Sequence, residues 1–380
     1  MTIYLDNAAT SHPKPACVYE AVRRALSDIG ASPGRAAHRR AREADAVLSD
    51  ARVKAAQLLG IDDPRTVSFT RNATESINIV LKGWLRPGDR VLISAVEHNS
   101  VVRPLSGLKS IGIQTTVVPC SERGTLRLDA FESLLDPPPR LVVLTHASNV
   151  NGGLQPVVEA ARLCRAGGIP LLLDAAQTAG LQTIRAKNWD LGMLACSGHK
   201  ALLGPPGVGI LYVRKDLDVR PLMEGGTGSR SEEDLQPDYS PDRYESGTPN
   251  LPGIAGLAAG MAFIVEEGMD ALLRHELELS RRIEEGLSLN SRVRVLRPDV
   301  RGTGTVSFTV DGLNPSDIGH ILDEAFDIAV RTGLHCAPLA HRTLGTFPEG
   351  TVRVSPGFST SSTDIDYFLD SMRLLLSRQR

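Results

Sequence analysis

The sequence contains few cysteines, no long apolar run and no excess of charge of one sign. Its 380 residues include five cysteines, an odd number with no Cys-x-x-Cys pair, which argues against a disulfide framework or a cysteine-rich metal site. No apolar stretch approaches the roughly 20 residues that a membrane-spanning helix needs. The formal net charge of −2 argues against a broad electrostatic surface for nucleic acid or anionic membrane. The first residues, Met1–Asp6, lack the basic-then-apolar pattern of a signal peptide, so we expect a cytoplasmic protein.

The chain is too long for one ordinary hydrophobic core and predicts two domains. Short apolar runs alternate with helical patterns up to Val213, which predicts an α/β fold with a mainly parallel sheet covered by helices on both faces. The C-terminal third changes character, with charged amphipathic helices and an alternating strand at 303–310. We therefore predict a large domain over residues 15–260. A small α+β domain over residues 1–14 and 261–380 carries Cys336.

An acidic residue ends one of the buried strands, and a lysine set among small residues follows the next strand. The first strand ends in Asp174-Ala175-Ala176-Gln177, and the second leads into Ser197-Gly198-His199-Lys200. A pyridoxal phosphate (PLP) enzyme needs such a pair, because the lysine forms a Schiff base and the acid pairs with the pyridinium nitrogen. Acids also stand at strand ends in many other α/β proteins, so this pair alone leaves a structural alternative open.

Polar residues follow several of the predicted strands. Because parallel strands present their carboxyl ends at one edge, we expect these residues to form a single cleft. They are Asn72–Thr74, His98, Asn149, Asp174 with Gln177, and Ser197–Lys200. Two of them have alternatives: the turn before a helix at 76–85 is either a phosphate site or an ordinary N-cap, and His98 either stacks on a flat cofactor or caps a helix.

Cys336 differs from the other cysteines because it lies in a loop without apolar periodicity. The loop runs from Arg331 to Pro338, and His335 directly precedes the cysteine. A thiol beside histidine and arginine can have a depressed pKa and act as a thiolate nucleophile. The alternative is a packed or incidental cysteine. The polar, glycine-rich segment 222–250 predicts a long loop, and loops of that length are usually functional.

Taken together, the motifs closely resemble the class V aminotransferase-like PLP enzymes of fold-type I, in the branch of cysteine desulfurases and selenocysteine lyases. The resemblance runs almost end to end and rests on Tyr4–Thr10, Asp174–Gln177, Ser197–Lys200, Gly247–Asn250, Arg331–Ala337 and Val352–Ser355. It implies a seven-stranded type of sheet in the large PLP-binding domain and a homodimer. The short loop around Cys336 resembles the sulfur-mobilisation branch, which includes enzymes of iron–sulfur cluster assembly, whereas Asn99 stands where that branch usually has a second histidine.

The resemblance also implies a role for each candidate residue. Lys200 would carry the cofactor and move protons, Asp174 would hold the pyridine nitrogen protonated, and His98 would stack on the ring. Gln177 would bond the ring hydroxyl oxygen. The phosphate ligands would be Ala73, Thr74, Ser197 and His199, with Thr248 from the neighbouring subunit. The substrate ligands would be Asn149, Arg353, Arg331 and His335, and the catalytic residues Cys336, Lys200 and His98.

The implied reaction converts L-cysteine, or L-selenocysteine, to alanine. Cys336 as a thiolate attacks the substrate sulfur, becomes a persulfide and passes the sulfur to an acceptor protein. One alternative is another class V activity, such as an aminotransferase, an epimerase or an amino-acid lyase, that needs no thiol. A second alternative is a catalytically idle partner that kept the fold. Neither nucleic acid, membrane nor metal is expected as a partner.

Overall fold

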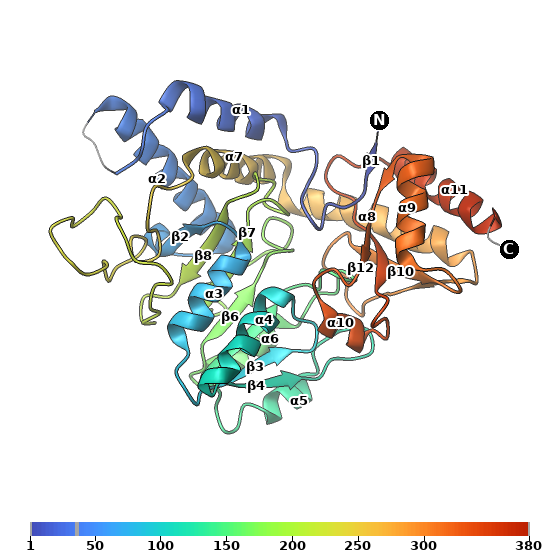
Figure 1. The fold of residues 1–380 in the computed structure, drawn as a ribbon, viewed down its shortest axis with the longest axis horizontal. Helices are drawn as coiled ribbons and strands as arrows, with labels where there is room; N and C mark the ends of the chain where they lie inside the picture. The colour runs from blue at the N-terminus through green and yellow to red at the C-terminus, as the bar shows by residue number, and fades with distance from the viewer. Residues whose placement is uncertain (1, 35–37, 379–380) are drawn as a thin grey trace.

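The computed structural model describes residues 2–34 and 38–378 and contains one large sheet (Figure 1). The large sheet has seven strands in the order β2-β8-β7-β6-β5-β3-β4. All neighbouring strands are parallel except β8, which is antiparallel to both β2 and β7, and this confirms the predicted mainly parallel sheet. The bounds are β2 (Val67–Thr70), β3 (Arg90–Ser94), β4 (Gln114–Val118), β5 (Leu141–Thr145), β6 (Leu171–Asp174), β7 (Met193–Ser197) and β8 (Gly209–Val213).

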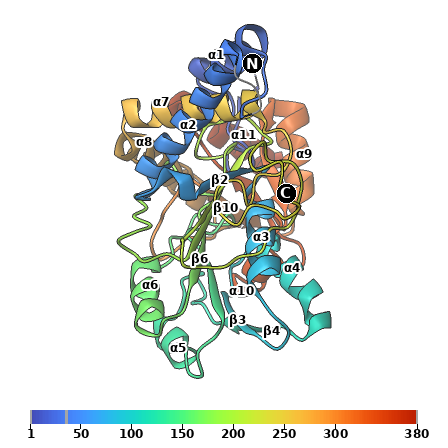
Figure 2. The same cartoon turned by 90° about the vertical axis from the view of Figure 1, so that its left-hand side faces the viewer.

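Helices cover both faces of this sheet because its central strands are apolar on both sides (Figure 2). In β6, Leu171 and Leu173 belong to the core beneath α2, α6 and α7, whereas Leu172 belongs to the core beneath α3 and α4. The helices are α1 (Ala16–Arg24), α2 (Arg39–Leu59), α3 (Ala73–Trp84), α4 (Asn99–Leu108), α5 (Leu128–Ser133), α6 (Val157–Ala166) and α7 (Leu251–Glu267). A π-helical turn, Ala25–Ile29, follows α1, and 3₁₀ turns lie at Pro64–Thr66 and Lys109–Ile111.

Helix α7 packs closely on the backbone that follows Lys200. A Cβ added at Gly260 would lie 2.5 Å from the carbonyl oxygen of Leu202, so only glycine allows this approach. The helix crosses residue 260 without a break, and Ile264 is buried in the core of the large sheet. The division of the chain at residue 260 stays a prediction.

The C-terminal part contains a separate sheet in the order β12-β13-β10-β9, in which all neighbours are antiparallel. Its strands are β9 (Val293–Val295), β10 (Val306–Val310), β12 (Arg331–Gly333) and β13 (Thr351–Val354). Its helices are α8 (Met269–Ser288), α9 (Pro315–Phe326), α10 (Pro338–Thr343) and α11 (Ser362–Arg378). The first strand of the chain, β1 (Ile3–Tyr4), pairs in parallel with β11 (Ile328–Ala329) and so lies in this part.

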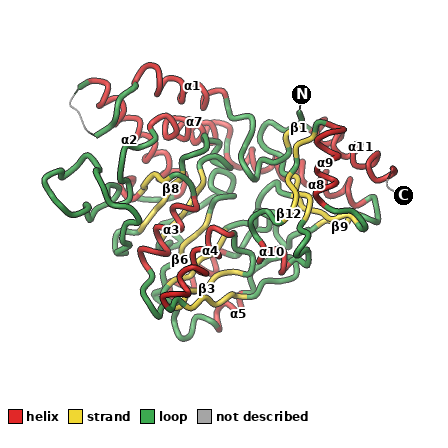
Figure 3. The backbone as a smooth tube through the Cα atoms, in the orientation of Figure 1, coloured by secondary structure: helices red, strands yellow, loops and turns green. Residues whose placement is uncertain are grey.

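The segment 214–250 contains neither helix nor strand, as Figure 3 shows, which confirms the long loop predicted at 222–250. Within residues 2–34 and 38–378, no single helix is long and apolar enough to cross a membrane. Helices α7 and α8 together have the necessary length and composition, but the pair is bent by 83° at the break between them.

Candidate active site

A cavity of about 360 Å³ lies at the carboxyl ends of β5, β6 and β7, where the sequence predicts a cleft. Most of the predicted cofactor residues line it. The lining residues are Ala73, Thr74, His98, Ser100, Thr145, Ala147, Asn149, Asp174, Ala176, Gln177, Ser197 and Lys200. Residues as far apart in the sequence as Ala73 and Lys200 thus meet in one place, although their roles stay predictions.

Lys200 and Asp174 both line this cavity, and the charge of each affects the pKa of the other. Burial lowers the pKa of Lys200 to about 8, while the nearby carboxylate of Asp174 opposes that effect. Burial also raises the pKa of Asp174, and its Oδ1 accepts a hydrogen bond of 3.0 Å from the Ala176 N–H. A lysine with such a pKa has an appreciable unprotonated fraction near neutral pH and acts as a nucleophile or a base.

The N-terminus of α3 forms another wall of the cavity. Asn72 caps the helix by accepting from the Glu75 N–H at 2.9 Å, so α3 begins at Ala73 and three residues earlier than the predicted start. The Ala73 N–H donates to Ser197 Oγ at 3.3 Å, and Thr74 is exposed toward the same cavity. Asn72 is therefore the N-cap that one interpretation of the sequence predicts, and the phosphate site that the other predicts at this helix end stays a prediction.

His98 is the helix cap that one sequence alternative predicts, and the other alternative, stacking on a flat cofactor, stays a prediction. It is the N-cap of α4, with Nδ1 accepting from the Ser100 N–H at 3.0 Å, and its ring lines the cavity. Burial, with Lys200 and several arginines, lowers the pKa of His98 to about 4. The ring is therefore neutral at physiological pH and carries its proton on Nε2.

Cys336 is exposed. The carbonyl groups of Cys336 and of the preceding His335 are both hydrogen-bonded to residues outside the loop. The His335 carbonyl accepts from Asn149 Nδ2 at 2.7 Å, and the Cys336 carbonyl accepts from the Asn99 N–H at 2.8 Å. Arg331 Nη2 lies 3.7 Å from the Cys336 sulfur. The thiol thus has a cation beside it and reaches solvent, although the loop itself does not line the 360 Å³ cavity.

Arg353 lies on β13, next to Arg331 of β12 in the sheet register. Its side chain is 1% exposed, Nη2 contacts Asp6 Oδ1 at 2.6 Å, and Nη1 donates to the Asn149 carbonyl at 3.1 Å. Burial lowers the pKa of Arg353, and the Asp6 carboxylate opposes that effect. The predicted substrate ligands Asn149, His335 and Arg353 are therefore joined by direct contacts, with Arg331 beside them.

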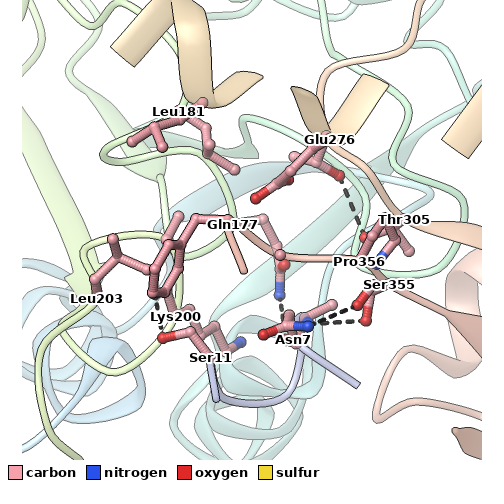
Figure 4. A pocket seen from close by; sticks show the side chains of 16 residues that line it. Asn7, Ser11, Gln177, Leu181, Lys200, Leu203, Glu276, Thr305, Ser355 and Pro356 are labelled. Atoms are coloured by element: carbon pink, nitrogen blue, oxygen red, sulfur yellow. Dashed lines mark hydrogen bonds between the residues drawn. The ribbon is translucent and has the colours of Figure 1, made fainter. Parts of the chain in front are cut away.

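A second cavity, of about 510 Å³, adjoins Lys200 and Gln177 on another side (Figure 4). Gln177 Nε2 donates to the Ala8 carbonyl at 3.1 Å across its edge. Glu276 of α8 also lines it, and burial raises the pKa of this carboxyl to about 8, while a bond from the Gly304 N–H opposes that effect. The large sheet and the C-terminal part thus meet directly beside Lys200.

Two of the predicted phosphate ligands do not line the cavity of Lys200. His199 lies beside it in sequence, and its buried Nδ1 has no hydrogen-bond partner within the described chain. Thr248 is exposed and lines a separate cavity with Arg71, Asn72 and Glu75. Thr248 thus lies away from the Lys200 cavity of its own chain, and its predicted contact with the cofactor of a neighbouring subunit stays a prediction.

Several residues in contact with the site were not predicted. Lys14 Nζ donates to Ser11 Oγ at 2.7 Å and to the His199 carbonyl at 2.8 Å, which braces the Lys200 loop. Glu97 is fully buried beside His98, and burial raises its pKa to about 8. The position of Glu97 just after β3 is a signal that could have placed it at the site, whereas Lys14 has no local pattern that would predict its contact.

Comparison with known proteins places this geometry in a family. The family model described as Aminotransferase class-V matches residues 3–368. The chain belongs to the class-V aminotransferases, in the cysteine desulfurase group. This family depends on PLP, and its cysteine desulfurases act on L-cysteine.

Relatives and solved structures agree with that assignment. A probable cysteine desulfurase of Methanothermobacter thermautotrophicus is 32% identical and matches over 96% of this chain and 92% of that protein. A probable cysteine desulfurase of Pyrococcus abyssi is 33% identical over 100% and 95% of the two chains. The apo structure of a Thermococcus onnurineus cysteine desulfurase superposes with a TM-score of 0.91 at 34% identity, covering 99% of this chain and 95% of that one. The Escherichia coli cysteine desulfurase CsdA gives 0.89 at 29% identity with the same coverage.

Proposed function

We propose that the protein is a PLP-dependent cysteine desulfurase that converts L-cysteine to L-alanine and holds the sulfur as a persulfide on Cys336. The observation that carries the proposal is the position of Cys336. It is an exposed thiol beside Arg331, on a loop that is hydrogen-bonded to Asn149. Asn149 also lines the cavity that contains Lys200, called the lysine cavity below. A class-V enzyme without thiol chemistry has no need for such a cysteine.

The cavity residues fit PLP. The fit rests on the N-terminus of α3 at Ala73 and Thr74 and on a buried carboxyl at Asp174 beside a lysine of lowered pKa. Next to Lys200 in the sequence, His199 adds a buried Nδ1 without a hydrogen-bond partner among the described residues. When bound, PLP supplies an electron sink for the electrons released at the substrate Cα. Lys200 would attach it, Asp174 would keep its ring nitrogen protonated, Gln177 would bond the ring oxygen, and His98 would lie against the ring. Ser197, His199, Thr74 and the Ala73 N–H would hold its phosphate.

The remaining residues act on the amino acid and its sulfur. The Arg353 guanidinium and the Asn149 amide would orient the substrate carboxylate, because a guanidinium can donate two parallel hydrogen bonds to a carboxylate. The amine of Lys200 would take the proton from Cα and return protons to the carbon fragment. Cys336 as a thiolate attacks the substrate sulfur, so that a sulfur–sulfur bond forms while the Cβ–sulfur bond breaks. Overall, the Cys336 thiol and L-cysteine give the Cys336 persulfide and L-alanine.

Four further parts of the proposal concern the partners, a second substrate and the location of the protein. Thr248 would reach the phosphate bound by the other subunit of a homodimer, and an acceptor protein would collect the sulfur from the exposed Cys336. L-Selenocysteine would react at the same site. All five cysteines are free, and a catalytic thiol works best in a reducing compartment, which supports a cytoplasmic location.

The test is mass spectrometry of the purified, PLP-loaded protein after incubation with L-cysteine. We expect one added sulfur atom on the Cys336 peptide and alanine release that continues when a reductant removes the persulfide. Cys336→Ala should keep the cofactor absorbance and lose alanine release by at least 100-fold. The matched control is Cys17→Ala, which changes another exposed cysteine, outside the site. Unchanged turnover in Cys336→Ala would instead assign a class-V activity that uses no thiol.

A further inference from the structure

The backbone of the nucleophile loop is held in a conformation that residues with side chains seldom adopt. His335 has φ +47° and Cys336 has φ +57°, so two consecutive non-glycine residues are left-handed. The Cβ of an L-residue crowds its own carbonyl in this region, and the chain stays there only when contacts around it outweigh that crowding. The conformation therefore depends on whatever holds these two residues.

The described contacts that hold the loop are few. Inside the loop, the Ala337 N–H donates to the Leu334 carbonyl at 2.8 Å. Thr351 of β13 contacts the loop from outside, with its Oγ1 2.8 Å from His335 Nε2. The Cys336 carbonyl is bound by the backbone N–H of Asn99. The His335 carbonyl is bound by a side chain, the Asn149 amide, at 2.7 Å. This last contact is the shortest of the four and the one that comes from a residue lining the lysine cavity.

Asn149 is itself fixed in place. It follows β5 and is buried, and its own carbonyl accepts from Arg353 Nη1 at 3.1 Å. The same guanidinium is paired with Asp6. A continuous set of contacts therefore runs from Asp6 through Arg353 and Asn149 to the carbonyl group adjoining Cys336.

We propose that Asn149 is a positioning residue for the nucleophile: its Nδ2–H···O=C bond to His335 holds His335 and Cys336 left-handed and keeps the Cys336 sulfur beside Arg331. This proposal rests on the proposed function. It adds to the role in binding the substrate carboxylate that the family resemblance implies. One N–H of the amide binds the loop, which leaves its second N–H for substrate. Asn149 would thus bind the substrate carboxylate and also hold the loop that carries the attacking thiol.

Two measurements on the PLP-loaded enzyme separate positioning from substrate binding. The first is hydrogen–deuterium exchange of the amides at 334–337 without substrate. The second compares two reactions with L-amino acids: persulfide formation from L-cysteine, which needs Cys336, and exchange of the α-proton of L-alanine in D₂O, which does not. Asn149→Ala is the variant. Asn151→Ala is the matched control, because Asn151 is a buried amide in the same loop that binds Arg123 and Gly153 instead.

In Asn149→Ala we expect amide exchange at 334–337 to speed up at least tenfold and persulfide formation to fall at least tenfold further than α-proton exchange. Asn151→Ala should leave both the amide exchange and the ratio of the two reactions within about threefold of the wild type. If Asn149→Ala does not fold, Asn149→Asp carries the same test, since it keeps the shape and replaces the donor by an acceptor.

Unchanged amide exchange, or equal loss of the two reactions, overturns the positioning role and leaves Asn149 as a substrate ligand alone. The amide exchange needs no turnover, so it tests the contact even if the enzyme proves to have another activity. A failure of the proposed function would show instead as an absent persulfide in the wild-type protein.

Discussion

Arg353 and Asp6 form a salt bridge of 2.6 Å although 347 residues separate them in the sequence. The Arg353 side chain is 1% exposed and that of Asp6 is 20% exposed, so water screens the pair only weakly. The pair joins the loop after β1 to β13 and sets the direction of the guanidinium. Together with the pairing of β1 and β11, it places the first residues of the chain at the active site.

Removal of the Asp6 charge should destabilise the protein. Asp6→Asn keeps the shape but leaves a buried guanidinium without its counter-charge, which we expect to cost ~3–5 kcal/mol of the free energy of unfolding and to raise KM for L-cysteine. The control is Asp366→Asn, which breaks the surface pair with Arg282, whose side chains are 49% and 50% exposed. That change should cost less than about 1 kcal/mol. Equal urea-unfolding midpoints for the two variants would contradict the prediction.

The pKa of Lys200 should be visible in the attachment of the cofactor. Only the unprotonated amine reacts with the aldehyde of PLP. Burial lowers the pKa of Lys200 to about 8, whereas an ordinary lysine titrates near ~10.4. The rate at which apoprotein gains PLP absorbance should rise about tenfold per pH unit below 8 and level off above it.

Asp174→Asn offers a control on the direction of this effect. The Asp174 carboxylate favours the protonated amine of Lys200, so its removal should shift the midpoint of the attachment rate to lower pH. A midpoint near that of free N-acetyl-lysine, measured in the same buffers, would show that Lys200 is not buried as described.

The seven-stranded sheet and the cavity at the carboxyl ends of its strands were predictable from the sequence, because apolar runs such as Leu141–Thr145 indicate buried parallel strands. The polar residues after these strands then had to lie at one edge. The pair of Asp6 and Arg353 was not predictable, since no local pattern encodes a contact over 347 residues. Neither were the left-handed backbone at Cys336 or the cavity beside Glu276, which arise only when the C-terminal part packs on the sheet.

Acid should destabilise the protein through its buried histidines. Burial lowers the pKa of His146 to about 4, of His341 to about 4 and of His335 to about 2. In the unfolded chain a histidine titrates near ~6.5, so the fold favours the neutral rings. The stability from this preference is fully present above about pH 6.5 and is lost as the pH falls toward 4. The raised pKa values of Glu97 and Glu276 act in the opposite direction, so the urea midpoint should fall from pH 7 to pH 5 by less than the histidines alone would give.

His341→Gln tests the origin of this slope. Glutamine does not titrate and can still bond Thr346, the partner of His341 Nδ1 at 2.7 Å. The variant should show a flatter dependence of the unfolding free energy on pH between 5 and 7 than the wild type. His320→Gln, at an exposed position, is the matched substitution. An unchanged slope in His341→Gln would mean that this ring titrates alike in both states.

The contact between α7 and the loop after Lys200 should depend on Gly260. In Gly260→Ala the new Cβ would lie 2.5 Å from the Leu202 carbonyl oxygen, and both partners are backbone, so neither can move aside freely. We expect a loss of ~1–3 kcal/mol in the free energy of unfolding and a lower PLP content, because the displaced segment adjoins Lys200. Gly107→Ala, in α4 with nothing within 4 Å of the added atom, should instead stabilise the protein by about 0.5–1 kcal/mol through helix propensity. Urea unfolding of both variants measures the contrast, and a stabilising Gly260→Ala would contradict close packing at this point.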